Sequence, residues 1–309
     1  MADLAIVIVN YNVCDHLRTC LRSIEASRLD QIPDVWVVDN ASTDGSLEMV
    51  RREFPWVRAR EAGGNLGFAR ANNRALREIL GDARERGLPR YVLLLNPDTE
   101  LPPMALAEMV AFMESHPEAG AAGPKLVLAD GSLDLACRRG FPTPEVAFYR
   151  LTGLSQLFPR SRRFGRYNLT FLDPDDVVEV DSVVGAFMVV RGSLLKSVGL
   201  LDEAFFMYGE DLDWALRIKQ AGWKVYYNGQ TEVYHYKRAS SRQRNVRSLV
   251  AFYEAMLIFF RKHYAKRTAW PIRWLIVTAI YLRAAVAIAL SRGPVRWSDR
   301  VHNQVQMAR

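Results

Sequence analysis

The sequence contains few cysteines, and none is arranged as in a disulfide framework or a zinc site. Three are present among the 309 residues, and none has Cys-x-x-Cys spacing: Cys14, Cys20 and Cys137. We therefore expect reduced thiols in a reducing compartment. The N-terminal region also lacks a basic segment followed by a long apolar stretch and a cleavage site, which is the pattern of a signal peptide. These absences predict a protein that stays in the cytoplasm.

Missing motifs also disfavour two classes of ligand. No Gly-x-Gly-x-x-Gly follows the first apolar run, so a dehydrogenase is not expected. The net charge is +7, and much of it lies in residues 138–166 and 237–309, but no nucleic-acid-binding motif accompanies it. The basic residues near the C-terminus alternate with tryptophan and long aliphatic runs, as they do in membrane-surface helices. We therefore predict a membrane surface as a partner of this half, and no nucleic acid.

The order of apolar runs predicts an α/β fold. Strand patterns at 4–9, 35–38, 57–61 and 91–95 are separated by helical patterns, which is the spacing of βαβ units. We expect a mostly parallel sheet with helices on both faces and ligands at the carboxyl ends of the strands. Three local expectations follow: Asp15 caps the first helix, 138–176 forms a lid or acceptor loop, and 223–227 and 231–236 form two short closing strands.

The most hydrophobic window of its length, 270–290, lacks the ~18 uninterrupted apolar residues of a clear spanning helix. Arg273 and Arg283 interrupt it, and a central arginine costs about 2.5–3.5 kcal/mol on insertion scales. We predict helices that lie in the membrane interface, anchored by Trp270, Trp274 and Trp297. Two alternatives stay open: a helix that spans the bilayer, and a helical pair packed on the protein's own core or on a second subunit of a homodimer.

Asp98 stands just beyond the strand predicted at 91–95, where the proline of Asn96-Pro97-Asp98 fixes the turn. A carboxylate at this edge can hold Mg²⁺ or Mn²⁺ over a diphosphate, and the ion would offset the charge of a departing nucleoside diphosphate. The alternative is a solvated turn aspartate. We favour the metal site because open α/β sheets bind ligands at this edge.

Glu210 and Asp211 stand at the predicted N-terminus of a later helix. A carboxylate placed there can deprotonate an acceptor hydroxyl, yet acidic residues in a first turn also stabilise a helix through its dipole. His235 ends a short predicted strand and is a candidate metal ligand, although a lone histidine is more often structural. The residue patterns leave both roles open in each case.

Two further segments at the same edge are candidate ligand contacts. Asp39 follows the strand at 35–38 and can accept a hydrogen bond from the imide N–H of a pyrimidine base, or it can cap the next helix. The segment 63–73 leads a glycine turn into a helix N-terminus, which permits close backbone approach and favours negative charge. Ordinary capping of that helix is the alternative.

Each motif is weak alone, but their order along the chain resembles that of the family 2 inverting glycosyltransferases, and within them the bacterial rhamnosyltransferase-like members that build surface polysaccharides. The similarity covers roughly the first four-fifths of the chain. It rests on these segments: Ile6-Val7-Ile8-Val9-Asn10-Tyr11-Asn12, Val37-Val38-Asp39-Asn40-Ala41-Ser42-Thr43-Asp44-Gly45, Asn65-Leu66-Gly67-Phe68-Ala69 with Asn72-Asn73, Leu94-Leu95-Asn96-Pro97-Asp98, Gly185-Ala186-Phe187-Met188, and Gly209-Glu210-Asp211-Leu212-Asp213 to His235.

The resemblance implies a GT-A fold in residues 1–240, with a nucleotide-sugar-binding half at 1–127 and an acceptor-binding half at 128–240. The basic residues 241–309 would form a C-terminal helical extension. The implied roles cover four sets of residues: donor contacts from Asn10, Tyr11, Asn12, Asp39, Asn40, Asn65, Phe68, Ala69, Asn73, Asn96 and Asp98; acceptor contacts from Gly185, Ala186 and Trp214; metal ligands Asp98 and His235; and the base Asp211, with Glu210 as runner-up.

The implied reaction is transfer of a sugar, with inversion, from a nucleoside diphosphate to a glycan or polyprenyl-linked acceptor in cell-surface polysaccharide synthesis. L-rhamnose from dTDP-rhamnose is the leading donor, and a UDP-hexose or UDP-N-acetylhexosamine is the alternative. A catalytically dead, nucleotide-binding membrane scaffold is the competing reading. The motif is Asn-Pro-Asp rather than Asp-x-Asp, so only one carboxylate is certain to be available to a metal. The expected location is the inner face of the bacterial cell membrane, peripherally associated.

Overall fold

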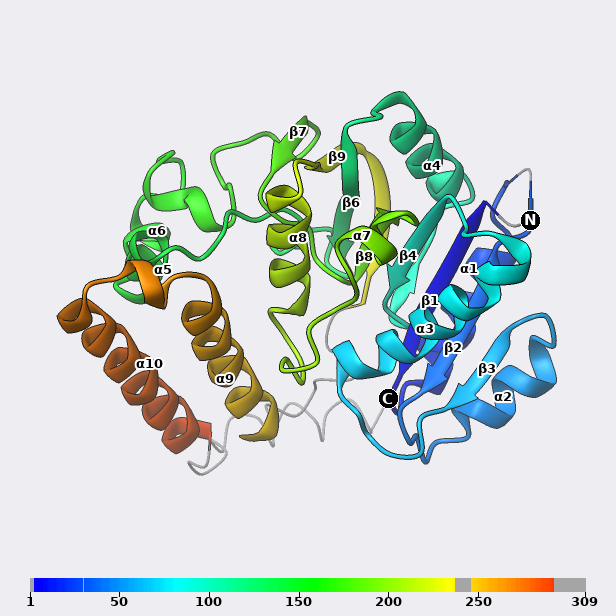
Figure 1. Ribbon diagram of the computed structural model, residues 1–309, viewed down its shortest axis with the longest axis horizontal. Coiled ribbons are helices and arrows are strands. Elements are labelled where there is room, and N and C mark those ends of the chain that lie inside the picture. The colour runs from blue at the N-terminus through cyan, green and yellow to red at the C-terminus, as the bar shows by residue number, and fades with distance from the viewer. Residues whose placement is uncertain (1–2, 30, 237–245, 292–309) are drawn as a thin grey trace, which may run out of the picture.

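The computed structural model describes residues 3–29, 31–236 and 246–291, so 237–245 and 292–309 of the predicted extension lie outside the described residues. The described strands are β1 Leu4–Asn10, β2 Asp34–Asp39, β3 Arg58–Glu61, β4 Tyr91–Leu95, β5 Thr99–Glu100, β6 Ala119–Leu128, β7 Val177–Val180, β8 Phe187–Arg191 and β9 Lys224–His235. They form one mixed sheet in the order β3-β2-β1-β4-β8-β6-β9-β5, and β7 pairs with β9 outside this path (Figure 1).

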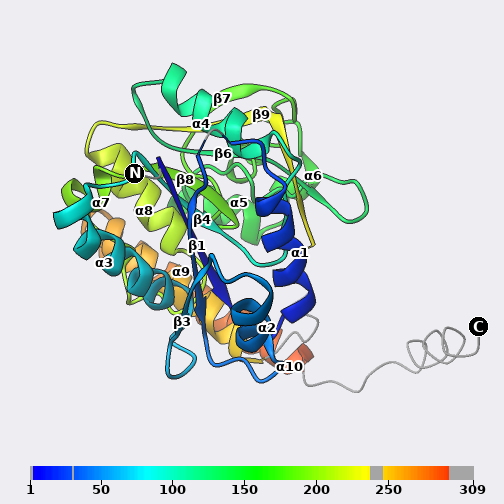
Figure 2. The same cartoon turned by 90° about the vertical axis from the view of Figure 1, so that its right-hand side faces the viewer.

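Helices cover both faces of this sheet. They are α1 Cys14–Glu25, α2 Ser46–Glu53, α3 Phe68–Arg86, α4 Ala105–Ser115, α5 Pro144–Leu151, α6 Leu154–Leu157, α7 Leu194–Ser197, α8 Glu210–Gln220, α9 Val246–His263 and α10 Trp270–Ser291, with 3₁₀ turns η1 Phe164–Tyr167 and η2 Ala265–Arg267. In Figure 2, α1 and α2 lie on one side of β1, and α3, α7 and α8 lie on the other.

The first half of the chain folds as the alternation of patterns predicts. Strands β1 to β4 pair in parallel, and every residue of β1 and β4 is buried. Continuous Val, Ile and Leu runs suit such strands because both faces are covered by helices. The carboxyl ends of β1, β2 and β4 therefore meet at one edge of the sheet, and β8 continues it as an antiparallel neighbour of β4.

Two local expectations are wrong. Helix α1 begins at Cys14, and the carboxylate that accepts the Cys14 N–H, at 2.8 Å, is that of Asp44, so Asp15 lies in the first turn instead of capping it. The two closing strands are a single strand, β9, whose register against β6 shifts after Asn228. Gly229 permits this irregularity, since a Cβ there would lie 2.4 Å from the carbonyl oxygen of Pro174.

The segment expected to be a lid or loop contains the short helices α5, α6 and η1 and is tied to the sheet. Its first residue, Arg138, is almost fully buried and donates to the carbonyl oxygens of Leu172 and Asp173. The guanidinium also lies 5.0 Å from the ring centroid of Tyr227 on β9. A charged side chain is stable there because both of its Nη groups donate to carbonyl oxygens and its face stacks on an aromatic ring.

The C-terminal helices α9 and α10 lie side by side in an antiparallel pair at the end of the molecule away from β3 (Figure 1). Helix α9 contributes Ala255 and Phe259 to a small second core, which they form with Phe205 and Leu212. Helix α10 is long and apolar enough to cross a membrane, by its length and composition, and most of it is exposed. Of the two helices, α9 is therefore the one whose apolar side chains pack into the protein core.

Candidate active site

The carboxyl ends of β1 and β2 carry a polar network. Asn10 and Asp39 are register partners in the sheet, and the Asn10 amide donates to Asp39 Oδ1 at 3.0 Å and to Ser42 Oγ at 3.0 Å. Asp39 Oδ2 accepts the Ser42 N–H at 2.8 Å. Tyr11 and Asn12 follow on an exposed loop, with Asn12 in the left-handed region at φ 53°. This edge is therefore shaped before any ligand binds.

A second set of contacts joins this network to α3. The Asn40 amide donates to Asn65 Oδ1 at 3.1 Å and to the Gly67 carbonyl at 3.3 Å, and Asn40 Oδ1 accepts the Leu66 N–H. Gly67 lies at φ 79°, and a Cβ there would lie 2.3 Å from the Phe206 carbonyl oxygen. Glycine is required at this position because the loop before α8 passes so close.

The acidic motif at the start of α8 meets three other predicted segments. Asp211 Oδ2 accepts the Gly185 N–H at 3.0 Å, and the ring of Phe68 packs against Gly185. The neighbouring Ala186 carbonyl accepts the Asn96 N–H at 2.9 Å, at the start of the Asn-Pro-Asp turn. Four segments that are far apart in the sequence thus converge on one place.

Asp211 is paired with a buried arginine that the sequence did not single out. Arg139 Nη2 donates to Asp211 Oδ2 at 2.6 Å and to the Val183 carbonyl at 2.9 Å, and both charged side chains are more than 90% buried. The Leu212 N–H donates to Asp211 Oδ1 at 2.7 Å. Burial lowers the pKa of Arg139, but the charge of Asp211 outweighs this effect and raises it above its usual value. Asp211 therefore lies against a buried positive charge.

Glu210, the adjacent acid, is in the opposite situation. It is buried, and its Oε2 atom has no hydrogen-bond partner among the described residues. Burial, and then the charge of Asp211, raise the pKa of Glu210 to about 8. At neutral pH Glu210 is therefore largely protonated.

Asp98 and His235 are brought together at the end of β9. His235 Nε2 lies 3.4 Å from Asp98 Oδ1, and Nδ1 lies 3.0 Å from Asp134 Oδ2. Burial lowers the pKa of His235, but its contacts with Asp134 and Asp98 prevail and raise it to about 9. Asp134 had no signal in the sequence, because it lies 101 residues from His235 and in no recognised motif.

Three of the implied site residues are placed in the interior. Trp214 is fully buried and its Nε1–H donates to the Gly199 carbonyl, so it lies in the core instead of on an acceptor surface. Asn73 is buried, and its amide binds the backbone of Leu201 in both directions. Ala69 is fully buried, its backbone included, so it offers no surface to a donor. Each faces inward because the helix that carries it packs that face on the sheet.

Two ligand atoms about 2.1 Å from one ion, at angles of about 90–110°, lie about 3.0–3.4 Å apart, so the spacing of Asp98 and His235 fits a cation that replaces the Nε2 proton of His235. Asp134 on the far ring nitrogen is the partner that a metal-bound histidine commonly has. The described residues contain no group of three or more His, Cys, Asp or Glu side chains placed to hold a metal ion. Any ion here would need ligands from a substrate.

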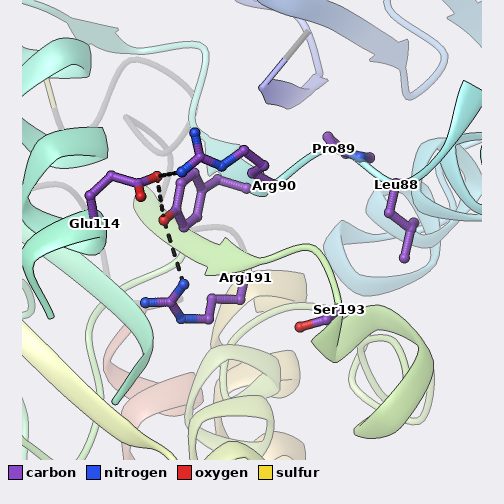
Figure 3. Close-up of a pocket in the computed structure, with 7 residues that line it drawn as sticks. Leu88, Pro89, Arg90, Glu114, Arg191 and Ser193 are labelled. Carbon is purple, nitrogen blue, oxygen red and sulfur yellow. Dashed lines mark hydrogen bonds and ion pairs between the residues drawn. The ribbon is translucent and has the colours of Figure 1, made fainter. Parts of the chain in front are cut away.

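A hollow of about 320 Å³ lies near the start of β4, away from these residues (Figure 3). Its polar groups bind one another: Arg90 pairs with Glu114, and the Tyr91 hydroxyl donates to Glu114 Oε1 at 2.8 Å. Arg191 donates to the carbonyl oxygens of Met113, His116 and Ala119 at the end of α4. The hollow is therefore a structural junction between α4 and the sheet.

Comparison with known families shows which family the chain belongs to. Residues 5–134 match the model of glycosyl transferase family 2, and residues 91–297 match that of glycosyl transferase family group 2. The chain belongs to glycosyltransferase family 2. This glycosyltransferase is 30% identical over 291 residues to an N-acetylglucosaminyl-diphospho-decaprenol L-rhamnosyltransferase of Mycobacterium tuberculosis. The aligned residues make up 93% of this chain and 94% of the relative.

Two further likenesses agree with this assignment. Rhamnosyltransferase WbbL of Escherichia coli K12 is 27% identical over 244 residues, which are 77% of this chain and 84% of the relative. The structure of the mannosyltransferase PcManGT of Pyrobaculum calidifontis, solved with GDP-Man and Mn²⁺, superposes with a TM-score of 0.55 and 17% identity. The superposed residues make up 99% of this chain and 80% of the PcManGT chain. The glycosyltransferase therefore has the GT-A fold, and the fold and family expected from the sequence are confirmed.

Proposed function

We propose that this glycosyltransferase transfers a sugar, with inversion, from a nucleoside diphosphate donor to a hydroxyl group of a lipid-linked glycan, with Asp211 as the base. One observation carries the proposal: Asp211 binds Gly185, and the adjacent Ala186 binds the turn that leads to Asp98. A base and a carboxylate suited to the diphosphate end of the donor are thereby joined through a single backbone segment.

The contacts of the two acids favour Asp211 over Glu210 as the base. A carboxylate has about four acceptor positions, and three of those of Asp211 receive N–H groups from Arg139, Gly185 and Leu212. The remaining position is available to the acceptor hydroxyl. Glu210, with its pKa near 8, is a weaker candidate because at neutral pH its proton is largely in place.

In the proposed step, Asp211 takes the proton of the acceptor hydroxyl while the hydroxyl oxygen forms its bond to the anomeric carbon. The bond between that carbon and the diphosphate oxygen breaks, and its electron pair leaves with the nucleoside diphosphate. Arg139 and the Gly185 N–H keep Asp211 oriented throughout. A general base of this kind contributes about 10²–10⁴-fold to the rate.

Asp98 and His235 are the residues that we propose to hold Mg²⁺ or Mn²⁺. Such an ion supplies positive charge that offsets the charge of the departing diphosphate. Asp134 orients the His235 ring, and Asp98 lies at the end of the turn fixed by Pro97. The ion would take its other ligands from the diphosphate, which predicts weak metal affinity in the absence of donor.

For the donor we propose L-rhamnose carried by thymidine diphosphate, with Asp39 reading the base, and for the acceptor a polyprenyl-diphosphate-linked sugar in cell-surface polysaccharide synthesis. The support is the activity for which the M. tuberculosis relative is named, together with the exposed apolar helix α10. A UDP-hexose or UDP-N-acetylhexosamine is the alternative donor. The same edge of the sheet would hold either nucleotide.

We also propose that α10 lies along the membrane surface at its cytoplasmic face and does not cross the bilayer. Arg283 donates to the Leu151 carbonyl of α5 at 2.6 Å, and at 1.5 Å per residue it lies about 20 Å along the helix from Trp270. If α10 spanned the bilayer, this contact would draw α5, with the charged Glu145 and Arg150, deep into hydrocarbon. An in-plane helix avoids this cost, and Trp270 and Trp274 are both exposed.

The test combines donor binding with transfer. Calorimetric titration of thymidine, uridine and guanosine diphosphates, each with and without Mn²⁺, identifies the nucleotide, and Asp98→Ala is expected to abolish its metal-dependent binding. Asp211→Asn is expected to keep binding and lose transfer by about 10²–10⁴-fold. Asp15→Asn, an exposed aspartate of α1, is the control. Failure of every nucleotide to bind would contradict the proposed transfer, and nucleotide binding without any transfer would favour the non-catalytic scaffold. Full transfer by Asp211→Asn would exclude Asp211 as the base.

A further inference from the structure

A third carboxylate of the acidic motif has a separate set of partners. Asp213 is fully buried in the first turn of α8, two residues after Asp211. Arg217 Nε donates to its Oδ2 at 2.8 Å. Its Oδ1 lies 2.7 Å from both Lys262 Nζ and His263 Nε2, which are the last side chains of α9. The end of α9 is thus tied to the start of the helix that carries the base.

Asp213 is ionised in this environment. Burial raises the pKa of this carboxyl, but hydrogen bonds from His263 and Lys262 and the charge of Arg217 prevail and lower the pKa to about 2. A buried carboxylate is stable only while its donors remain. Loss of a donor from α9 would therefore change the position of the α8 turn, since the charge must find water or another partner.

The turn immediately before the acids is also covered by α9. Tyr208 and Gly209 both lie in the left-handed region, at φ 71° and 85°, and for a tyrosine this conformation is strained. The ring of Phe252 packs edge-on against Tyr208 at 6.0 Å, and Ala255 Cβ approaches the open side of Gly209. Such strained backbone persists only where its surroundings enforce it.

We propose that α9 is a positioning element of the active site, and that Asp213, Lys262 and His263 are positioning residues that aim Asp211 at the acceptor. This inference rests on the proposed role of Asp211 as base. It extends the catalytic unit through α9, beyond the boundary at residue 240 that the sequence predicts. Because α9 leads through η2 into the exposed helix α10, the same contacts connect the proposed membrane-facing helix to the base.

Variants of His263 in the full-length protein test the proposal, because they alter one donor to Asp213 and no proposed substrate contact. His263→Leu removes the donor, and His263→Gln can restore an N–H at the same reach. We expect His263→Leu to lower kcat by about tenfold or more, since small misplacements of a catalytic group are costly, with donor affinity by calorimetry unchanged. His263→Gln should retain most of kcat. Lys266→Ala, an exposed lysine of η2, should match the wild type.

Three outcomes decide the matter. Full kcat in His263→Leu would overturn the proposal, and so would an equal loss of kcat and melting temperature in both His263 variants, which indicates a general structural role. If His263→Leu does not fold, Lys262→Met tests the second donor from a partly exposed position. Asp211→Asn is assayed alongside: if it retains transfer, the base assignment fails, whatever the His263 variants do.

Discussion

Helices α9 and α10 adjoin in the chain and are both rich in apolar residues, yet they occupy opposite environments. Helix α9 buries Ala251, Ala255 and Phe259, which recur every fourth residue and form one stripe. Helix α10 buries one described side chain, that of Ile280, and exposes most of its large apolar residues to solvent. Apolar content alone does not decide where a helix lies. Helix α9 packs on protein through its buried residues and the polar anchors at its end, whereas α10 leaves most of its apolar surface exposed.

The largest effect should follow removal of both helices. A chain that ends before Val246 leaves Asp213 with Arg217 as its described partner and uncovers Phe205 and Leu212. Breaking a buried ion pair costs about 3–5 kcal/mol, so we expect loss of transfer and of cooperative unfolding. Activity assays and thermal melts check this. Full transfer by this truncated chain would show that the active site does not depend on α9.

A chain that ends after Arg267, which retains α9 and lacks α10, should behave differently. Donor binding and transfer to a water-soluble acceptor should stay within about twofold of the full chain, because Lys262 and His263 still reach Asp213. Sedimentation with anionic vesicles should fall sharply. Undiminished sedimentation would show that the membrane contact lies outside α10.

The pH dependence of stability tests the burial of the turn beneath α9. The pKa of Glu210 rises from 4.5 in the unfolded chain to about 8 in the folded protein, so its contribution is fully present below pH 4.5 and is lost as pH rises through 8. At about 1.4 kcal/mol per pKa unit, the change across this window is on the order of a few kcal/mol. Glu210→Gln should flatten the unfolding free energy between pH 4.5 and 8, as measured by denaturant titration. If the slope of the unfolding free energy against pH is the same in Glu210→Gln and in the wild type, Glu210 is exposed to solvent instead of buried.

The smallest effect should come from Arg283, which joins α10 to α5. Its guanidinium is exposed, and a hydrogen bond of this kind contributes about 0.5–1.5 kcal/mol at most. Arg283→Ala should leave transfer and melting temperature nearly unchanged while altering how deeply Trp270 and Trp274 insert. Fluorescence quenching by brominated lipids reports that depth, and no change would weaken the in-plane arrangement of α10.

The patterns that predicted correctly are local ones. The apolar runs at 4–9 and 91–95 can only be strands covered on both faces, and the polar residues after them must then meet at one edge. The ordered motifs placed the chain in its family. Asp44 shows the limit of local patterns, since the first helix is capped by a carboxylate 30 residues away and not by the nearby Asp15.

The basic stretch beginning at residue 138 illustrates what charge counting misses. Arg138 and Arg139 belong to a stretch assigned to anionic partners, but both are buried, one on carbonyl oxygens and the other on Asp211. The sequence offers no sign of this difference, because an arginine beside a proline-rich segment is usually solvated. Burial of a charge depends on whether a partner arrives from elsewhere in the chain.

Composition and periodicity were sufficient to place strands, helices and the polar edge of the sheet, because those features depend on side chains within a few residues of one another. Which acids are buried, which groups they contact, and what aims them was decided only on folding. Arg139 and Asp211 are 72 residues apart, and Asp213 and His263 are 50 apart. Contacts of this length follow from how helices pack on the sheet, and that packing sets the burial and partners on which the chemistry depends.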